Sequence, residues 1–101
     1  MSQQRVKVRV PTALRRLAED RATVEVALSG ESATAGEVLA ALRSCYPGVH
    51  DAALDERGRV RPHVNVFVGA DNIRLADGLA TPVPAGTEVW ILPAVSGGSS
   101  T

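Results

Sequence analysis

The sequence predicts an α+β domain in which a mixed sheet of four to five strands packs against one main helix. Apolar residues alternate with polar ones near both ends of the chain, which indicates half-buried strands. One segment in the middle has helical periodicity instead. The order is therefore two strands, one helix and two or three strands, and a sheet layered on a helix buries their apolar faces. A chain of 101 residues suffices for one such domain.

The first two strands are predicted to form an antiparallel hairpin. Residues 5–10 alternate valine with charged residues, and Pro11 ends this strand because proline has no amide hydrogen for the ladder. Residues 12–22 connect it to the second strand, residues 23–30, and we expect a helical turn within the connection. The side chains expected to point toward the core are Val6, Val8, Val10, Leu14, Leu17, Val24, Val26 and Leu28.

The only strong helix signal begins at Thr34. Thr34 and Glu37 have the spacing of a capping box, in which each residue satisfies a backbone amide of the other. Pro47 and Gly48 predict the end of the helix. One face carries Val38, Leu39, Leu42 and Cys45, so Cys45 is predicted to be a small core residue.

The second half of the chain is predicted to hold the remaining strands. Residues 49–63 indicate a loop with one short turn, residues 64–68 a strand, residues 73–75 a short strand, and residues 87–93 the last strand. The first and last strands are both strongly apolar on one face, so we expect them to lie side by side at the centre. The inward side chains are predicted to be Val64, Val66, Val68, Val89 and Ile91.

On the opposite face of the last strands, Phe67, Trp90 and Leu92 are predicted to form an exposed apolar strip. Exposed clusters of this kind on small domains usually mark a contact site. The alternative is that Phe67 or Trp90 is covered by a loop and belongs to the core.

The composition argues against several function classes. Lys and Arg together number 11, as do Asp and Glu, so we expect no binding to nucleic acid or to a membrane surface. The first ten residues contain no long apolar run and predict neither a signal peptide nor a membrane span. Cys45 is the only cysteine, which favours a reducing compartment, and we expect a cytoplasmic location.

The other polar groups give weaker signals. No metal site is predicted, because Cys45, His50 and His63 do not have a standard zinc spacing. No bound cofactor is predicted either. No phosphate-binding glycine loop is present. A basic run alternates along residues 57–61 and consists of Arg57, Arg59 and Arg61. It indicates a solvated loop edge or, alternatively, a docking patch for an acidic partner.

The chain is divided into a domain, residues 1–95, and a small-residue tail, residues 96–101. The tail carries Gly97 and Gly98 and continues with Ser99, Ser100 and Thr101. Two glycines alone are weak evidence of function. They are a more specific signal when they directly follow a terminal apolar strand, in a chain of this length and strand order.

On these features the chain resembles the β-grasp (ubiquitin-like) sulfur carriers of the MoaD/ThiS family, and within them the CysO-type carriers of cysteine biosynthesis. The most telling stretches are "PTALR" after the first strand, "VNVFV", and "GLATPVPAGTEVWILPAVSGG". The resemblance covers nearly the whole chain. It implies a protein substrate of other enzymes, not an enzyme.

The resemblance also implies what the tail does. An E1-like enzyme of the MoeB/ThiF type would use ATP and Mg to adenylate the carboxylate of Gly98, and a sulfur donor would convert it to a thiocarboxylate. Gly97 and Gly98 would pass a narrow channel of that enzyme because they lack Cβ atoms. The contacts with the partner are expected from Phe67, Trp90, Leu92, Pro93, Ala94, Val95 and Ser96.

The sequence departs from the family pattern after Gly98, because an amide joins Gly98 to Ser99 and cannot be adenylated at that carbon. We expect a protease, which the resemblance suggests is a JAMM-type metalloprotease, to cut between Gly98 and Ser99. The alternatives are trimming by any exopeptidase, or residues foreign to the natural chain.

The sulfur acceptor and the class of function stay open at this point. The resemblance suggests a PLP-dependent cysteine synthase acting on a phosphorylated serine derivative, while a thiosugar synthase, molybdopterin synthesis or thiamine synthesis are alternatives. A ubiquitin-like modifier that forms isopeptide bonds through Gly98 needs the same activated carboxylate. A small binding subunit with an inert tail is the third possibility.

Overall fold

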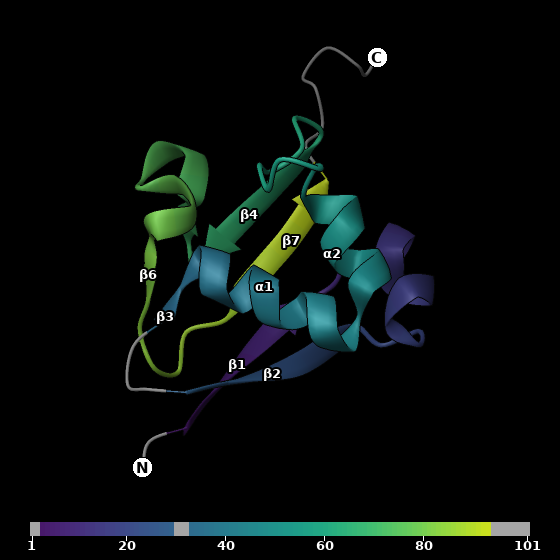
Figure 1. Ribbon diagram of the computed structural model, residues 1–101, viewed down its shortest axis with the longest axis horizontal. Coiled ribbons are helices and arrows are strands. Elements are labelled where there is room, and N and C mark those ends of the chain that lie inside the picture. The colour runs from purple at the N-terminus through teal and green to yellow at the C-terminus, as the bar shows by residue number, and fades with distance from the viewer. Residues whose placement is uncertain (1–2, 30–32, 94–101) are drawn as a thin grey trace.

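The computed structural model describes residues 3–29 and 33–93. Its main sheet has five strands in the order β2-β1-β7-β4-β5, and a separate two-stranded ribbon pairs β3 with β6 (Figure 1). The strands are β1 (Gln3–Arg9), β2 (Thr23–Ser29), β3 (Ala33–Thr34), β4 (Val64–Val68), β5 (Asp71–Asn72), β6 (Pro82–Val83) and β7 (Val89–Pro93). The helices are α1 (Ala35–Cys45), α2 (Pro47–Ala53) and the short 3₁₀ helices η1 (Thr12–Ala18), η2 (Ile73–Leu75) and η3 (Gly78–Ala80).

The two strands at the centre of the sheet come from opposite ends of the described chain. β1 and β7 are parallel, whereas β2 pairs with β1 and β4 pairs with β7 in antiparallel fashion. The predicted hairpin, the central pairing of the first and last strands and the mixed α+β sheet are therefore confirmed. Val8 and Val89, which pair in these strands, are 81 residues apart in sequence, so the position of β7 depends on folding of the chain between them.

The core lies between one face of the sheet and the two α-helices. The inward valines of β1, β2 and β4 are at most 6% exposed, and Val89 and Ile91 of β7 are at most 1% exposed. They pack with Val38, Leu39 and Leu42 of α1, which are fully buried. Each such side chain contributes about 1.5–3 kcal/mol through burial.

The capping box of α1 is confirmed. The Thr34 hydroxyl accepts a hydrogen bond from the Glu37 amide at 3.2 Å, and the Glu37 carboxylate accepts one from the Thr34 amide at 2.9 Å. The prediction that Cys45 is a core residue is wrong, because Cys45 is exposed. At 3.6 residues per turn, Cys45 lies about 70° from the centre of the buried face, and Tyr46 lies closer to it. Tyr46 packs against the core instead.

A second helix occupies part of the segment that was predicted to be a loop. Pro47 and Gly48 end α1 as expected, but Pro47 also begins α2, which continues to Ala53. Proline suits the first position of a helix because the amide hydrogen that it lacks would have no intrahelical partner there. Val49 and Ala53 are fully buried, so tertiary packing stabilises this short helix.

Two further predictions about apolar residues are wrong. Residues 73–75 form the 3₁₀ helix η2, because the Asn72 side chain accepts a hydrogen bond from the Arg74 amide and starts a turn. In η1, Leu14 packs against the core as predicted, but Leu17 is 36% exposed. Leu17 lies against Gly48 at the start of α2, where an added Cβ would be 3.0 Å from Leu17 Cδ2.

None of the helices in residues 3–29 and 33–93 is long and apolar enough to cross a membrane. The predicted boundary between domain and tail lies outside the described residues.

Candidate functional site: the open sheet face and the end of β7

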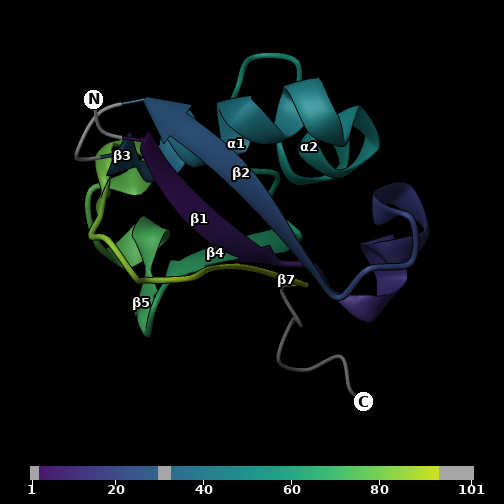
Figure 2. The ribbon, with the colours of Figure 1, turned by 90° about the horizontal axis from the view of Figure 1, so that it is seen from below.

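One row of side chains crosses the main sheet on the face opposite the helices. Figure 2 shows both α-helices on a single side of the sheet. The strand register places Thr23 of β2 opposite Arg9 of β1, Arg9 beside Trp90 of β7, Trp90 opposite Phe67 of β4, and Phe67 opposite Asn72 of β5. Residues paired in this way share a face, so the row links all five strands.

Trp90 lies at the middle of this row and is held by Arg9. The guanidinium carbon of Arg9 lies 4.6 Å from the centre of the Trp90 ring, a cation–π geometry. Arg9 Nη1 donates a hydrogen bond to the Thr23 hydroxyl at 2.9 Å, and Arg9 Nε lies 3.4 Å from a Glu88 carboxylate oxygen. Trp90 is half-buried, and the Arg9 side chain, held by Thr23 and Glu88, covers one face of its ring.

Phe67 and Leu92 extend the apolar surface on both sides of Trp90. Phe67 is directly opposite Trp90, and Leu92 lies two residues further along β7, opposite Asn65. Both point to the open face, but they are half-buried and not exposed as predicted. We call Phe67, Trp90 and Leu92 the apolar strip. Its orientation agrees with the prediction, and its role in binding a partner stays a prediction.

The last described residue, Pro93, is exposed at the end of β7, where it pairs with Val64. The other predicted site residues lie outside the described residues: Ala94, Val95, Ser96, Gly97, Gly98 and Ser99. The described part of the site is therefore the strip and the point from which the tail departs.

Two hollows adjoin the end of β7. The first, which we call the α2 groove, has a volume of about 440 Å³ and lies between η1, α2 and β7, with Leu14, Ala52 and Leu92 in its wall. The second has a volume of about 550 Å³ and includes Arg9, Arg15 and Trp90, and we call it the arginine hollow. Pro93 lines both, so both hollows lie at the end of the last described strand.

The loop beside the end of β7 is fixed by Asp55. One carboxylate oxygen of Asp55 accepts hydrogen bonds from the backbone amides of Arg59 and Arg57, both at 2.9 Å. The Arg59 amide, followed by the Arg57 amide, favours the ionised carboxylate and holds the pKa of Asp55 below its ordinary value. The sequence analysis missed this anchor, although an aspartate followed by a glycine three residues later is a turn signal.

The basic run in this loop does not form one uniform patch. Arg57 and Arg59 are exposed, but Arg61 donates from Nε to the Asp51 carbonyl oxygen at 2.9 Å. Arg74 in turn donates to the Arg61 and Val64 carbonyl oxygens, each at 2.6 Å. The solvated loop edge is confirmed for the first two arginines, whereas docking to an acidic partner stays a prediction.

Within the part of the chain that the structure describes, no group of three or more His, Cys, Asp or Glu side chains is placed to hold a metal ion. His50 lies 3.0 Å from the carboxylate of Asp51, its neighbour in sequence.

The family follows from a comparison with known proteins. The model of the family described as ThiS matches residues 8–98. The chain belongs to the ThiS family. The matched range ends on Gly98, the second glycine of the tail, and leaves out Ser99, Ser100 and Thr101.

The relatives of this ThiS-family chain include the CysO type. Sulfur carrier protein CysO of Mycobacterium tuberculosis is 36% identical over 95 residues, which cover 92% of this chain and 98% of CysO. The crystal structure of that CysO matches with a TM-score of 0.78 over 89% of this chain and 99% of CysO, at 35% identity. The resemblance to CysO-type carriers and the β-grasp fold are confirmed, and the relatives are carriers, not enzymes.

Two further relatives bear on the choice of function. A chain in the crystal structure of the BexX/CysO complex from Amycolatopsis orientalis matches with a TM-score of 0.76 and 32% identity, over 90% of this chain and 97% of that one. Small archaeal modifier protein 3 of Haloferax volcanii is 37% identical over 68 residues, which cover 67% of this chain and 73% of that protein.

Proposed function

We propose that this ThiS-family chain carries sulfur as a thiocarboxylate on Gly98, which an E1-like enzyme of the MoeB/ThiF type forms from the free carboxylate. The observation that carries the proposal is the family match over residues 8–98, which ends on the second glycine. Its CysO relatives are sulfur carriers, and they align over nearly their whole length.

The chemistry explains why a carrier needs an activating enzyme. A carboxylate is a poor electrophile because its negative charge repels nucleophiles. Attack of the Gly98 carboxylate on ATP would form an acyl-adenylate and release pyrophosphate. A sulfur nucleophile would then bond to the carbonyl carbon and displace AMP, which leaves the thiocarboxylate. ATP and Mg belong to the partner in this scheme, and the carrier itself binds no cofactor.

The geometry of β7 supports this scheme. The strand pairs with β1 at Val89 and Trp90 and with β4 along its whole length, where Pro93 lies opposite Val64. From Pro93 to Gly98 a fully extended chain spans at most about 17 Å. A partner that grips the apolar strip would thus have its nucleotide site within that distance of Pro93, and glycine at positions 97 and 98 permits close backbone approach.

The apolar strip has the composition of a binding centre. Aromatic side chains near the middle of an interface commonly dominate its affinity. Trp90 and Phe67 are neighbours on adjacent strands, and the contacts of Arg9 fix the position of Trp90 before any partner arrives. Pre-ordered side chains lose less conformational entropy on binding.

The tail beyond Gly98 is proposed to be a mask. Ser99 places the Gly98 carbonyl in an amide, so the full chain has no carboxylate at that carbon. A JAMM-type metalloprotease that cuts between Gly98 and Ser99 would expose it. The same enzyme would release cysteine from Gly98 if the carrier serves a PLP-dependent cysteine synthase, the acceptor that the resemblance to CysO-type carriers suggests. A thiosugar synthase is the other acceptor class.

A protein modifier is the second candidate function, and one observation favours it: a relative of similar identity is named a small archaeal modifier. In that case the activated Gly98 would form isopeptide bonds with lysine side chains of other proteins. The two functions share adenylation and differ in the nucleophile that attacks.

Intact mass spectrometry tests these proposals together. The full chain and a chain truncated after Gly98 are incubated with an E1-like enzyme of proven competence, ATP and sulfide. We expect only the truncated chain to gain the mass of sulfur minus oxygen. Conjugates of higher mass that survive thiol treatment would support the modifier instead. No change in either chain would overturn both functions and leave the tail inert.

A further inference from the structure

The arginine hollow combines two guanidinium groups with apolar walls beside the end of β7. Arg9 comes from the end of β1 and Arg15 from η1, while Trp90 and Leu92 contribute wall from β7. The remaining lining residues are Val10, Pro11, Thr12, Ala13, Ala22, Ile91 and Pro93. No acidic residue lines this hollow among residues 3–29 and 33–93.

Both arginines keep hydrogen-bond donors available at the hollow. A guanidinium carries five N–H donors in a planar fork. Arg15 uses Nε to donate to the Val10 carbonyl oxygen at 3.2 Å, and within the described ranges its terminal nitrogens make no hydrogen bond or ion pair. Arg9 uses Nε and Nη1 for Glu88 and Thr23, and its side chain remains 41% exposed. Glu88 lies outside the lining.

The position and the lining of the hollow indicate what kind of group could bind there. It shares Trp90 and Leu92 with the apolar strip, so it is continuous with the candidate interface. The two terminal nitrogens of Arg15 form a fork that matches the planar oxygens of a carboxylate, and Arg9 Nη2 offers one further donor. The apolar walls suit the methylene groups of a side chain that carries it.

We propose that the arginine hollow binds an acidic side chain of the E1-like partner while that partner holds the tail. This inference rests on the proposed function, since it concerns the same partner. The ion pairs fix the orientation of the partner relative to β7 and favour partners with a carboxylate at that place. A partner with a lysine or arginine there would be repelled, so Arg9 and Arg15 determine which activating enzyme the carrier uses.

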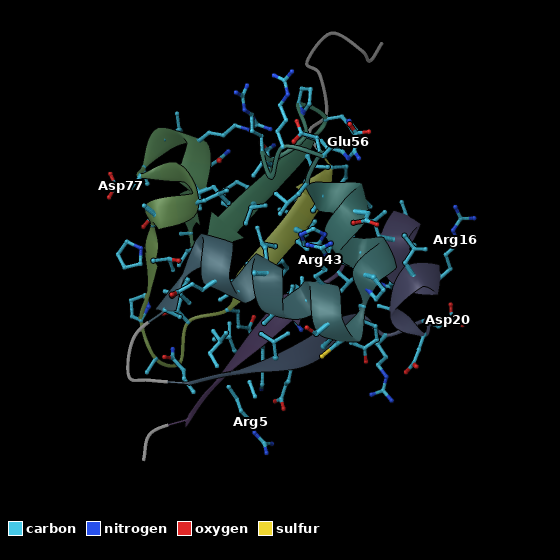
Figure 3. The ribbon with its side chains drawn as sticks, in the orientation of Figure 1. Arg5, Arg16, Asp20, Arg43, Glu56 and Asp77 are labelled. Carbon is cyan, nitrogen blue, oxygen red and sulfur yellow. The ribbon has the colours of Figure 1, made fainter. Side chains whose placement is uncertain are left out.

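Arg15 and Arg16 provide a matched pair for the test. They are neighbours on η1 and carry equal charge, but Arg16 is exposed outside the hollow and points away from the body of the protein (Figure 3). Arg9 is less suitable, because its removal would also release Trp90. Chains truncated after Gly98 are compared as wild type, Arg15→Glu, Arg16→Glu and Arg15→Gln.

We expect Arg15→Glu to weaken binding to the E1-like enzyme by about tenfold or more, and Arg16→Glu by about twofold or less. Arg15→Gln should fall between them, because it removes the positive charge without adding a negative one. Thermal unfolding of all four chains separates lost binding from lost folding. Arg15→Glu and Arg15→Gln should be slightly and equally less stable than wild type, because both lose the hydrogen bond from Arg15 Nε to the Val10 carbonyl oxygen. Raising the salt from about 0.1 M to about 1 M should reduce the difference between wild type and Arg15→Glu.

Three outcomes would overturn the inference. Equal weakening by Arg15→Glu and Arg16→Glu would mean that only the general charge of η1 matters. Unchanged binding of Arg15→Glu, with thiocarboxylate still formed on wild type, would remove the hollow from the interface. Binding of inorganic phosphate to wild type but not to Arg15→Glu, with partner binding unchanged, would assign the hollow to a small anion. Failure of wild type to form thiocarboxylate would instead contradict the proposed function.

Discussion

The two faces of the main sheet differ in what their side chains contact, although the same strands build both. On the inner face Val89 and Ile91 of β7 are at most 1% exposed and pack under the helices. On the open face Trp90 and Leu92 of the same strand stay half-buried and line the arginine hollow together with residues of η1. Because side chains alternate along a strand, the residues that stabilise the core alternate with those proposed to bind a partner along one five-residue strand.

This separation has a physical advantage for a carrier. In the proposed scheme the tail is presented from the end of β7, whose inner face is part of the core. The open face can change its affinity for partners without disturbing that core. A substitution on the inner face should therefore change mainly stability, and one on the open face mainly partner binding. Comparing the two kinds of substitution tests the site.

Ile91→Ala should have the largest effect on the fold. Removing a fully buried isoleucine costs about 2–5 kcal/mol, a large part of the roughly 5–15 kcal/mol that stabilises a domain. Its neighbour Leu92→Ala should cost less, about 1 kcal/mol, because part of this side chain already contacts water. Urea unfolding of both variants measures the difference. Equal costs would show that the two faces of β7 are not distinct.

Phe67→Asp should have the reverse effect, with the fold kept and the activation lost. A charge in the middle of the apolar strip should weaken binding to the E1-like enzyme by about thirtyfold or more, the effect of losing a central aromatic contact. Circular dichroism and thiocarboxylate formation are measured on the same preparation, and Leu75→Asp serves as control, since Leu75 is 88% exposed outside the strip. An unfolded Phe67→Asp chain would make Phe67 a core residue.

The sequence predicts the strands of this domain better than its helices. Alternation of valine with polar residues identifies β1, β2, β4 and β7, since a half-buried strand permits only one pattern. It also identifies the outward direction of the apolar strip. The contacts of Arg9 escape the sequence, because they join residues from three strands whose pairing is known only in the folded sheet.

The wrong predictions concern residues whose local sequence pattern is compatible with two structures. Pro47 signals the end of one helix and equally the first position of another, and only the burial of Val49 and Ala53 decides for α2. Cys45 satisfies the spacing of the apolar face but lies at its edge, where the end of α1 leaves it exposed. In both cases tertiary packing overrides a local pattern.

Thr34→Ala should have a moderate effect on stability and none on activation. It removes one hydrogen bond of the capping box at the start of α1, on the helix side of the sheet, and such losses cost about 1 kcal/mol. Ser44→Ala, at an exposed position of the same helix, should change stability by less than about 0.5 kcal/mol. Urea unfolding tests both. Reduced thiocarboxylate formation by Thr34→Ala would show that the helix side also binds the partner.

Protonation of Asp55 should have the smallest and most local effect, because Asp55 lies in the loop beside β7 and on neither face of the main sheet. The folded protein holds the pKa of Asp55 below its ordinary value, so the ionised carboxylate favours the folded loop. This contribution is complete above the ordinary pKa and is lost as the pH falls through the lowered one. The amide resonances of Arg57 and Arg59 should therefore shift together below about pH 4. Asp55→Asn should abolish these shifts while leaving activation near neutral pH unchanged, because Asn keeps an oxygen that accepts hydrogen bonds from the two amides. If the shifts persist in Asp55→Asn, another acid titrates there, and the loop is not anchored by Asp55.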